Sequence, residues 1–65
     1  MIIEFANSMY NFYQIISISQ PILKGGEYLI YLHYTGGCIA TEGFKTEDQA
    51  WKRYNELKNN IINFK

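Results

Sequence analysis

The chain has 65 residues, of which 48% are hydrophobic and 17% aromatic, and six basic residues balance six acidic ones. This length predicts a single domain over residues 1–65, the apolar content argues against disorder, and the neutral charge argues against a basic patch for nucleic acid. The lone cysteine excludes an internal disulfide, and no apolar run approaches the ~20 residues of a membrane span, so we expect a cytoplasmic protein without membrane contact.

The first dozen residues are compatible with more than one local structure. Their apolar side chains recur at a helical spacing, at Ile2, Phe5, Met9 and Phe12. The asparagine and serine residues between them are weak helix formers. We expect a short helix or an irregular lead-in here, in preference to a fourth strand.

Three segments rich in Ile, Leu and Tyr predict a small antiparallel sheet. They are residues 13–19, 27–35 and 38–44. Glycine pairs at Gly25-Gly26 and Gly36-Gly37 favour tight turns, because glycine accepts the positive φ that such turns require. Pro21 ends any helix or central strand before the first of these turns. The expected sheet is a meander with residues 27–35 in the centre.

The last element is the clearest. Thr46 and Gln49 form a capping box, with acidic residues in the first turn, where the helix dipole favours them. Apolar residues then recur every three or four positions, at Ala50, Tyr54, Leu57 and Ile61, with Trp51 and Ile62 beside them. This pattern predicts a long amphipathic helix over residues 46–62, with Lys52, Arg53 and Lys58 on its solvent face. The fold class is therefore α+β, with the strands followed by one helix.

The central strand has apolar side chains on both of its faces. A sheet that is covered on one side only is expected to alternate apolar with polar residues. One face of this strand carries tyrosine, isoleucine and leucine, and the other carries Leu29, Tyr31 and His33. A single helix covers one face, so the second is expected to contact the N-terminal segment, a second copy of the chain or another protein.

No residue pattern predicts catalysis, a metal or a cofactor. His33 is the only histidine, and with Cys38 it gives at most two metal ligands. A Cys38–His33 nucleophilic pair would need a cleft and a third group to orient the base, so a small buried cysteine is the simpler interpretation. Glu42 is interpreted as a polar strand position. We therefore expect no enzyme activity.

The run from Gly43 to Ala50, GFKTEDQA, resembles the strand-to-helix junction of the arm-type DNA-binding domain at the N-terminus of phage and transposon integrases. That domain is a three-stranded sheet with one helix, and Phe44, Thr46 and Ala50 match its junction residues. The resemblance implies DNA binding by the sheet face, for which this chain offers Lys24 and Lys45.

Two functions remain open from the sequence. The first is a non-catalytic protein-interaction module, such as a small phage or mobile-element regulator or inhibitor, that acts through the aromatic sheet face or as a homodimer. The abundance of Ile, Asn, Lys and Tyr is typical of AT-rich coding DNA and favours a phage or a mobile element as the source of the chain. The alternative is a nucleic-acid-binding domain of the integrase arm type.

Overall fold

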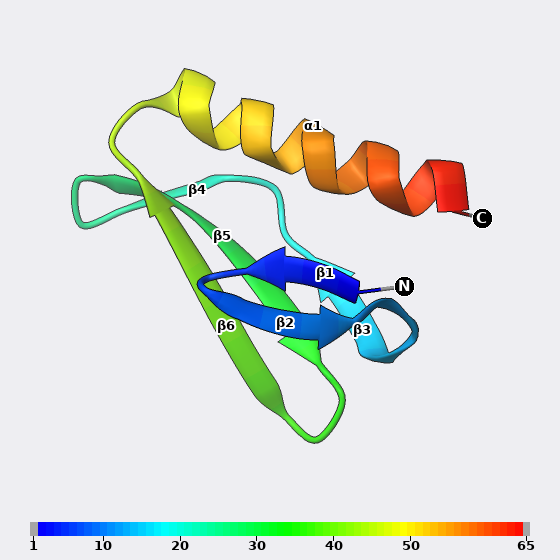
Figure 1. Cartoon of the computed structure of the whole chain (residues 1–65). Helices are drawn as coiled ribbons and strands as arrows, with labels where there is room; N and C mark the ends of the chain where they lie inside the picture. The colour runs from blue at the N-terminus through cyan, green and yellow to red at the C-terminus, as the bar shows by residue number, and fades with distance from the viewer. Residues whose placement is uncertain (1, 65) are drawn as a thin grey trace.

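The computed structural model describes residues 2–64 of the chain and the side chains of residues 2–59. Six strands and one α-helix occur in this part of the chain (Figure 1). They are β1 (Ile2–Phe5), β2 (Ser8–Asn11), β3 (Ile15–Ile18), β4 (Ile22–Lys24), β5 (Glu27–Tyr34), β6 (Cys38–Phe44) and α1 (Glu47–Phe64), with a 3-10 turn at Phe12–Gln14. The α+β class is confirmed. The expected three-stranded sheet is wrong, because a four-stranded sheet and a separate two-stranded hairpin are present instead.

Strand β5 lies in the centre of the larger sheet, as expected. Along one edge it pairs with β6, from Tyr28 opposite Phe44 to Tyr34 opposite Cys38. Its other edge is shared by β4 at the start of β5 and by β3 at its end. Gly25 and Gly26 form the turn between β4 and β5 with φ values of 60° and 82°, which an L side chain adopts only with strain.

The shared edge behaves as one strand with an interruption at residues 19–21. At the gap the Ser19 amide donates to the Tyr31 carbonyl (2.8 Å), and the Ser19 Oγ accepts from the Tyr31 amide (2.9 Å). A side chain thus replaces the backbone acceptor that a continuous ladder would supply. Pro21 follows and has no N–H to donate. The expected strand at residues 13–19 therefore corresponds to β3 alone, and β4 after Pro21 is an additional strand that was not predicted.

The N-terminal dozen residues form a β-hairpin, so the expected helix or irregular lead-in is wrong. Strands β1 and β2 are antiparallel and are joined by a two-residue turn, in which Ala6 and Asn7 both have positive φ. Alternation decides the structure, because Ile3 and Phe5 are buried whereas their neighbours in β1 are exposed. The apolar residues of this segment fit both periods, and only burial against the sheet selects the period of two.

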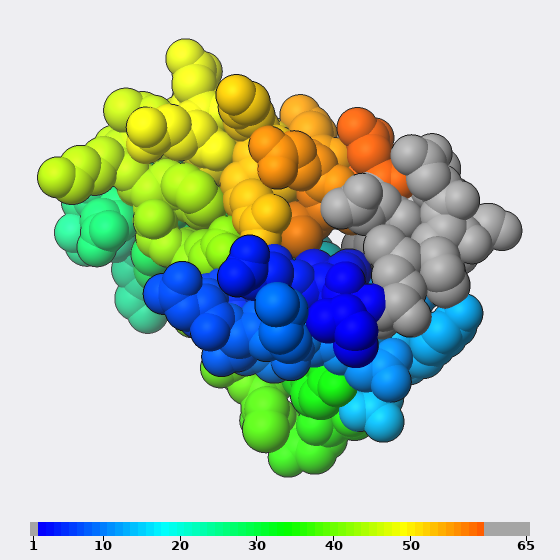
Figure 2. All heavy atoms as spheres, viewed as in Figure 1, coloured from blue at the N-terminus to red at the C-terminus, as the bar shows by residue number. Residues whose placement is uncertain are grey.

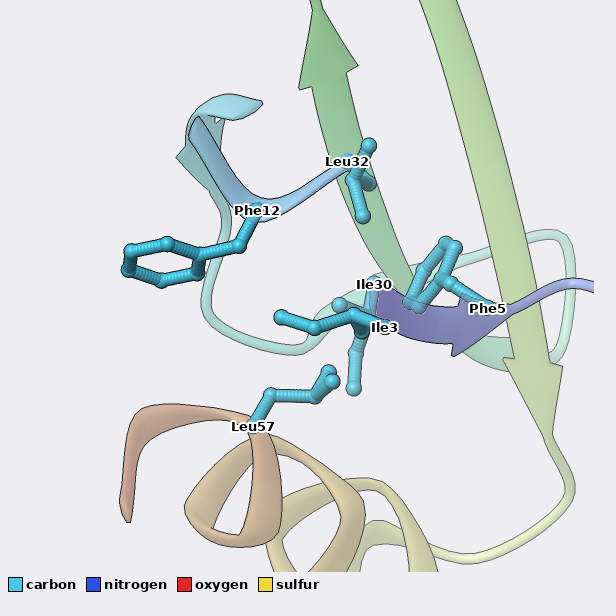
Figure 3. Packing of buried hydrophobic residues seen from close by; sticks show 6 residues of the cluster. All are labelled: Ile3, Phe5, Phe12, Ile30, Leu32 and Leu57. Carbon is cyan, nitrogen blue, oxygen red and sulfur yellow. The ribbon is translucent and has the colours of Figure 1, made fainter. Parts of the chain in front are cut away.

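The hairpin and the helix pack on the same face of the four-stranded sheet. The side chains between them form one cluster, which Figure 3 shows in close view: Ile3, Phe5, Phe12, Ile30, Leu32 and Leu57. In the space-filling view the hairpin (blue) lies directly against the helix (yellow and orange) (Figure 2). We call the face they cover the covered face.

Helix α1 begins one residue later than predicted and ends two residues later. Ala50 and Leu57 are buried and Tyr54 is half-buried, so the predicted stripe is confirmed where side chains are described. The side chains of Ile61 and Ile62 lie outside the described part. Trp51 stands at the edge of the stripe, with its ring edge-on to Tyr54 at 5.5 Å.

Thr46 caps this helix, since its Oγ1 accepts from the Gln49 amide at 3.3 Å. Thr46→Ala is expected to lower the free energy of unfolding by about 1 kcal/mol, because a first-turn N–H loses its partner. Urea denaturation followed by circular dichroism measures this change. Thr46→Ser keeps the hydroxyl and should stay close to wild type. If the cap does not stabilise the protein, Thr46→Ala and wild type will have the same midpoint of urea denaturation.

Candidate interaction surface

The face of the sheet opposite the helix carries no covering element within the described residues. Because side chains alternate along a strand, the odd-numbered residues of β5 point away from the core. Their register partners in β3, β4 and β6 share this side. We call this surface the open face, and it comprises Ser17, Ile22, Lys24, Glu27, Leu29, Tyr31, His33, Ile39, Thr41 and Gly43.

The three residues predicted as a partner-binding face lie together on the open face. Leu29 and Tyr31 are half-buried, by their neighbours within the sheet, and His33 is exposed. Two exposed apolar residues beside them were not predicted as part of this face: Ile22, because strand β4 was not predicted, and Ile39 of the predicted strand at residues 38–44. Ile22 lies opposite Leu29 and is 46% exposed, and Ile39 lies opposite His33 and is 58% exposed.

Gly43 shapes one end of the open face. A Cβ at this position would lie 3.0 Å from the Glu27 carboxylate and 3.3 Å from Leu29. Both side chains therefore lean over β6 in space that only glycine leaves vacant. The result is a continuous row from Ile22 through Leu29 to Gly43, with the Glu27 carboxylate at its outer end.

The two lysines predicted for nucleic-acid contact lie near this same end. Lys24 is the register partner of Glu27, and Lys45 directly follows the last residue of β6. The Glu27 carboxylate reaches over Gly43 from the strand between β4 and β6. A phosphate backbone placed here would meet an acidic group as well as the two basic ones, which reduces the electrostatic attraction.

His33 and Cys38 do not form a catalytic pair. His33 lies opposite Ile39 on the open face, whereas Cys38 lies opposite Tyr34, whose ring belongs to the covered face. The two side chains therefore point to opposite sides of the sheet. Cys38 is exposed, so the interpretation as a small buried cysteine is wrong. Its position beside the Gly36-Gly37 turn, at the end of an edge strand, explains the exposure.

Other chemistry is equally sparse in the described part of the chain. No three His, Cys, Asp or Glu side chains among the described residues lie close enough to hold a metal ion. None of the helical segments that the structure describes has the length and apolar character to cross a membrane.

One polar cluster differs from the prediction. The sequence predicts Arg53 on the solvent face of the helix and Glu42 as a polar strand position. In the structure the Arg53 Nε donates to the Glu42 Oε1 at 2.9 Å on the covered side of the sheet. A signal was present, because position 53 is three residues after Ala50 and four before Leu57, on the flank of the buried stripe.

Comparison of the chain with protein-family models, with curated protein sequences and with solved structures gives no match.

Proposed function

We propose that the protein is a non-catalytic interaction module that binds another protein through the open face. The observation that carries this proposal is the position of the N-terminal hairpin. It packs beside helix α1 on the covered face, so both covering layers lie on one side of the sheet. The apolar surplus of the central strand is thereby left accessible.

The side chains of the open face support an apolar surface of another protein as the ligand. Its central rows combine leucine, isoleucine and tyrosine, and its only fully charged side chains are Lys24 and Glu27 at one end. Interface cores are depleted of charge and enriched in aromatic residues. Binding through such a face depends on apolar burial, and we expect its affinity to change little with salt. The module would act as a regulator or inhibitor by occupying its partner.

Nucleic-acid binding is the alternative, and salt separates the two. A DNA ligand held by Lys24 and Lys45 would lose affinity steeply as salt rises, because neutralised phosphates release counterions. A gel shift that shows binding of duplex DNA at about 50 mM salt, and a steep loss of affinity at higher salt, would favour nucleic-acid binding over the proposal.

The test uses two lysine substitutions at similarly exposed apolar positions. Ile39→Lys charges the open face, whereas Met9→Lys charges the outer side of the hairpin, where Met9 is 69% exposed. We expect a partner captured by the wild-type protein to lose affinity at least about tenfold for Ile39→Lys, since burying a charge against an apolar surface is unfavourable. Met9→Lys should bind as wild type does.

The comparison is made with the purified partner by calorimetry, after capture on immobilised wild-type protein. Circular dichroism establishes that both variants are folded. Equal affinity of wild type and Ile39→Lys would place the contact elsewhere and contradict the proposal. The same holds if the Met9→Lys variant alone loses binding.

A further inference from the structure

We infer that in the free protein a second copy of the chain covers the open face, so that two sheets stack face to face around a two-fold axis. This inference rests on the proposed function, because it assigns an occupant to the same surface. Three observations carry it: the small core, the dimensions of the face and the arrangement of its charges.

The core within residues 2–59 is small for a domain that stands alone. Its buried hydrophobic residues are Ile3, Phe5, Phe12, Ile30, Leu32, Ala50 and Leu57. Domains below ~70–80 residues usually add disulfides, a metal ion or a second subunit. The single cysteine rules out a disulfide within the chain, and the described residues hold no metal-binding cluster. A second copy on the open face would add apolar burial to this small core.

The dimensions of the open face match a small dimer interface. Strand β5 has eight residues, and at ~3.3 Å per residue it spans about 26 Å. Its neighbours on either side widen the face to about 14 Å at the usual strand spacing of ~4.8 Å. Two such faces in contact bury on the order of 1,000 Å², at the lower limit for a specific interface. We therefore expect a dimer that forms at micromolar concentrations.

The charges on the face select one of two ways to stack the copies. Stacked sheets keep their strands within about 30° of each other, so the β5 strands of the two copies run either parallel or antiparallel. With parallel strands, Glu27 would face Glu27 of the second copy, and Lys24 would face the Lys45 region. Both contacts bring like charges together, which is unfavourable.

With antiparallel strands the charged end of one copy lies over the other end of its partner. That end is formed by His33, Ile39 and the turn at residues 35–37, and none of these residues is a lysine, an arginine or an acidic residue. The row that contains Tyr31 and Thr41 then lies on the two-fold axis, where each residue faces its own copy. The face is self-complementary only in this orientation, so we assign it to the dimer.

Sedimentation equilibrium of the full chain from about 5 to 500 μM tests the inference, a range chosen around the micromolar affinity expected for so small an interface. Wild type and Met9→Lys should move from 7.6 kDa toward twice that mass. Ile39→Glu should weaken dimerisation at least about tenfold, because residue 39 of each copy then lies over Gly43 of the other, beside its Glu27 carboxylate, and the two carboxylates repel. A wild-type protein that stays at 7.6 kDa throughout, or an Ile39→Glu variant that dimerises equally, would overturn the inference.

A cross-link tests the orientation. In a Cys38→Ser background, Thr41→Cys places one thiol per chain on the proposed axis. A short bismaleimide should then give covalent dimers, and adding Ile39→Glu should abolish them. Cross-linking that persists in the presence of Ile39→Glu would indicate pairing along the β6 edges and overturn face-to-face stacking. Absence of cross-linking in a protein that dimerises would overturn the antiparallel arrangement.

The failure of this inference is distinguishable from the failure of the proposed function. A monomeric wild-type protein that binds a purified partner in an Ile39-dependent way removes the dimer and leaves the interaction module. A dimer that Ile39→Glu dissociates, with no protein captured on the open face, supports the second copy and removes the foreign partner.

Discussion

Phe5→Ala is expected to lower the free energy of unfolding by about 3–5 kcal/mol, the usual cost of truncating a buried phenylalanine. Phe5 is 0% exposed and lies between the sheet and the helix. The Arg53 guanidinium lies 5.9 Å from the centre of its ring and adds a cation–π contact. A domain of this size has a total stability of about the same magnitude, so most of the variant should be unfolded at 25 °C.

Urea denaturation and the dispersion of amide proton signals measure the effect. Met9→Ala is the matched control, because it removes an apolar side chain from the same hairpin at a position that is 69% exposed. Its stability should stay within about 0.5 kcal/mol of wild type. If Phe5→Ala were as stable as Met9→Ala, the hairpin would not belong to the core.

This hairpin is also the element that local sequence patterns could not predict. Its turn residues, Ala6 and Asn7, adopt positive φ without the glycine that usually marks such a turn. The apolar residues of the segment fit a helix as well as a strand. The choice depends on the burial of Ile3 and Phe5 against strands that are distant in the sequence, and a local pattern does not contain that contact.

The elements with local signals were predictable. The cap at Thr46 and the stripe after it place the helix to within two residues, and the Gly25-Gly26 turn occurs as expected. Strand β4 was missed because Pro21 argues against a central strand, whereas β4 is a short edge strand that begins after it. The placement of Leu29, Tyr31 and His33 on one face followed from alternation. Which face of the sheet stays uncovered depends on where the hairpin packs, and the local sequence does not contain that information. The role of Leu29, Tyr31 and His33 in binding stays a prediction.

The contact between Arg53 and Glu42 joins three parts of the chain. The Glu42 carboxylate also accepts from the Ala6 amide in the hairpin turn (2.9 Å), and the Arg53 Nη2 donates to the Glu4 carbonyl (2.6 Å). One ion pair thus connects helix, sheet and hairpin. Both side chains are about a quarter exposed or less, at 26% and 19%, so solvent screens the pair less than it screens a surface pair.

Arg53→Ala is expected to destabilise the protein by about 2 kcal/mol, because hydrogen bonds to charged groups contribute more than neutral ones and Glu42 loses its counter-charge. Glu56 provides the matched control. Its carboxylate lies 3.8 Å from the Arg53 Nη1 and its side chain is 55% exposed, so Glu56→Ala should cost at most about 0.5 kcal/mol.

A double-mutant cycle with Glu42→Ala, measured by urea denaturation, separates the pair from the packing of each side chain. A coupling of about 1–2 kcal/mol between positions 42 and 53 is expected, against a few tenths between 56 and 53. Equal couplings for the two pairs would mean that Arg53 acts as a surface residue. The apolar contacts of Ile3 and Phe5 alone would then hold the hairpin to the helix. In that case Phe5→Ala would destabilise the protein and Arg53→Ala would not.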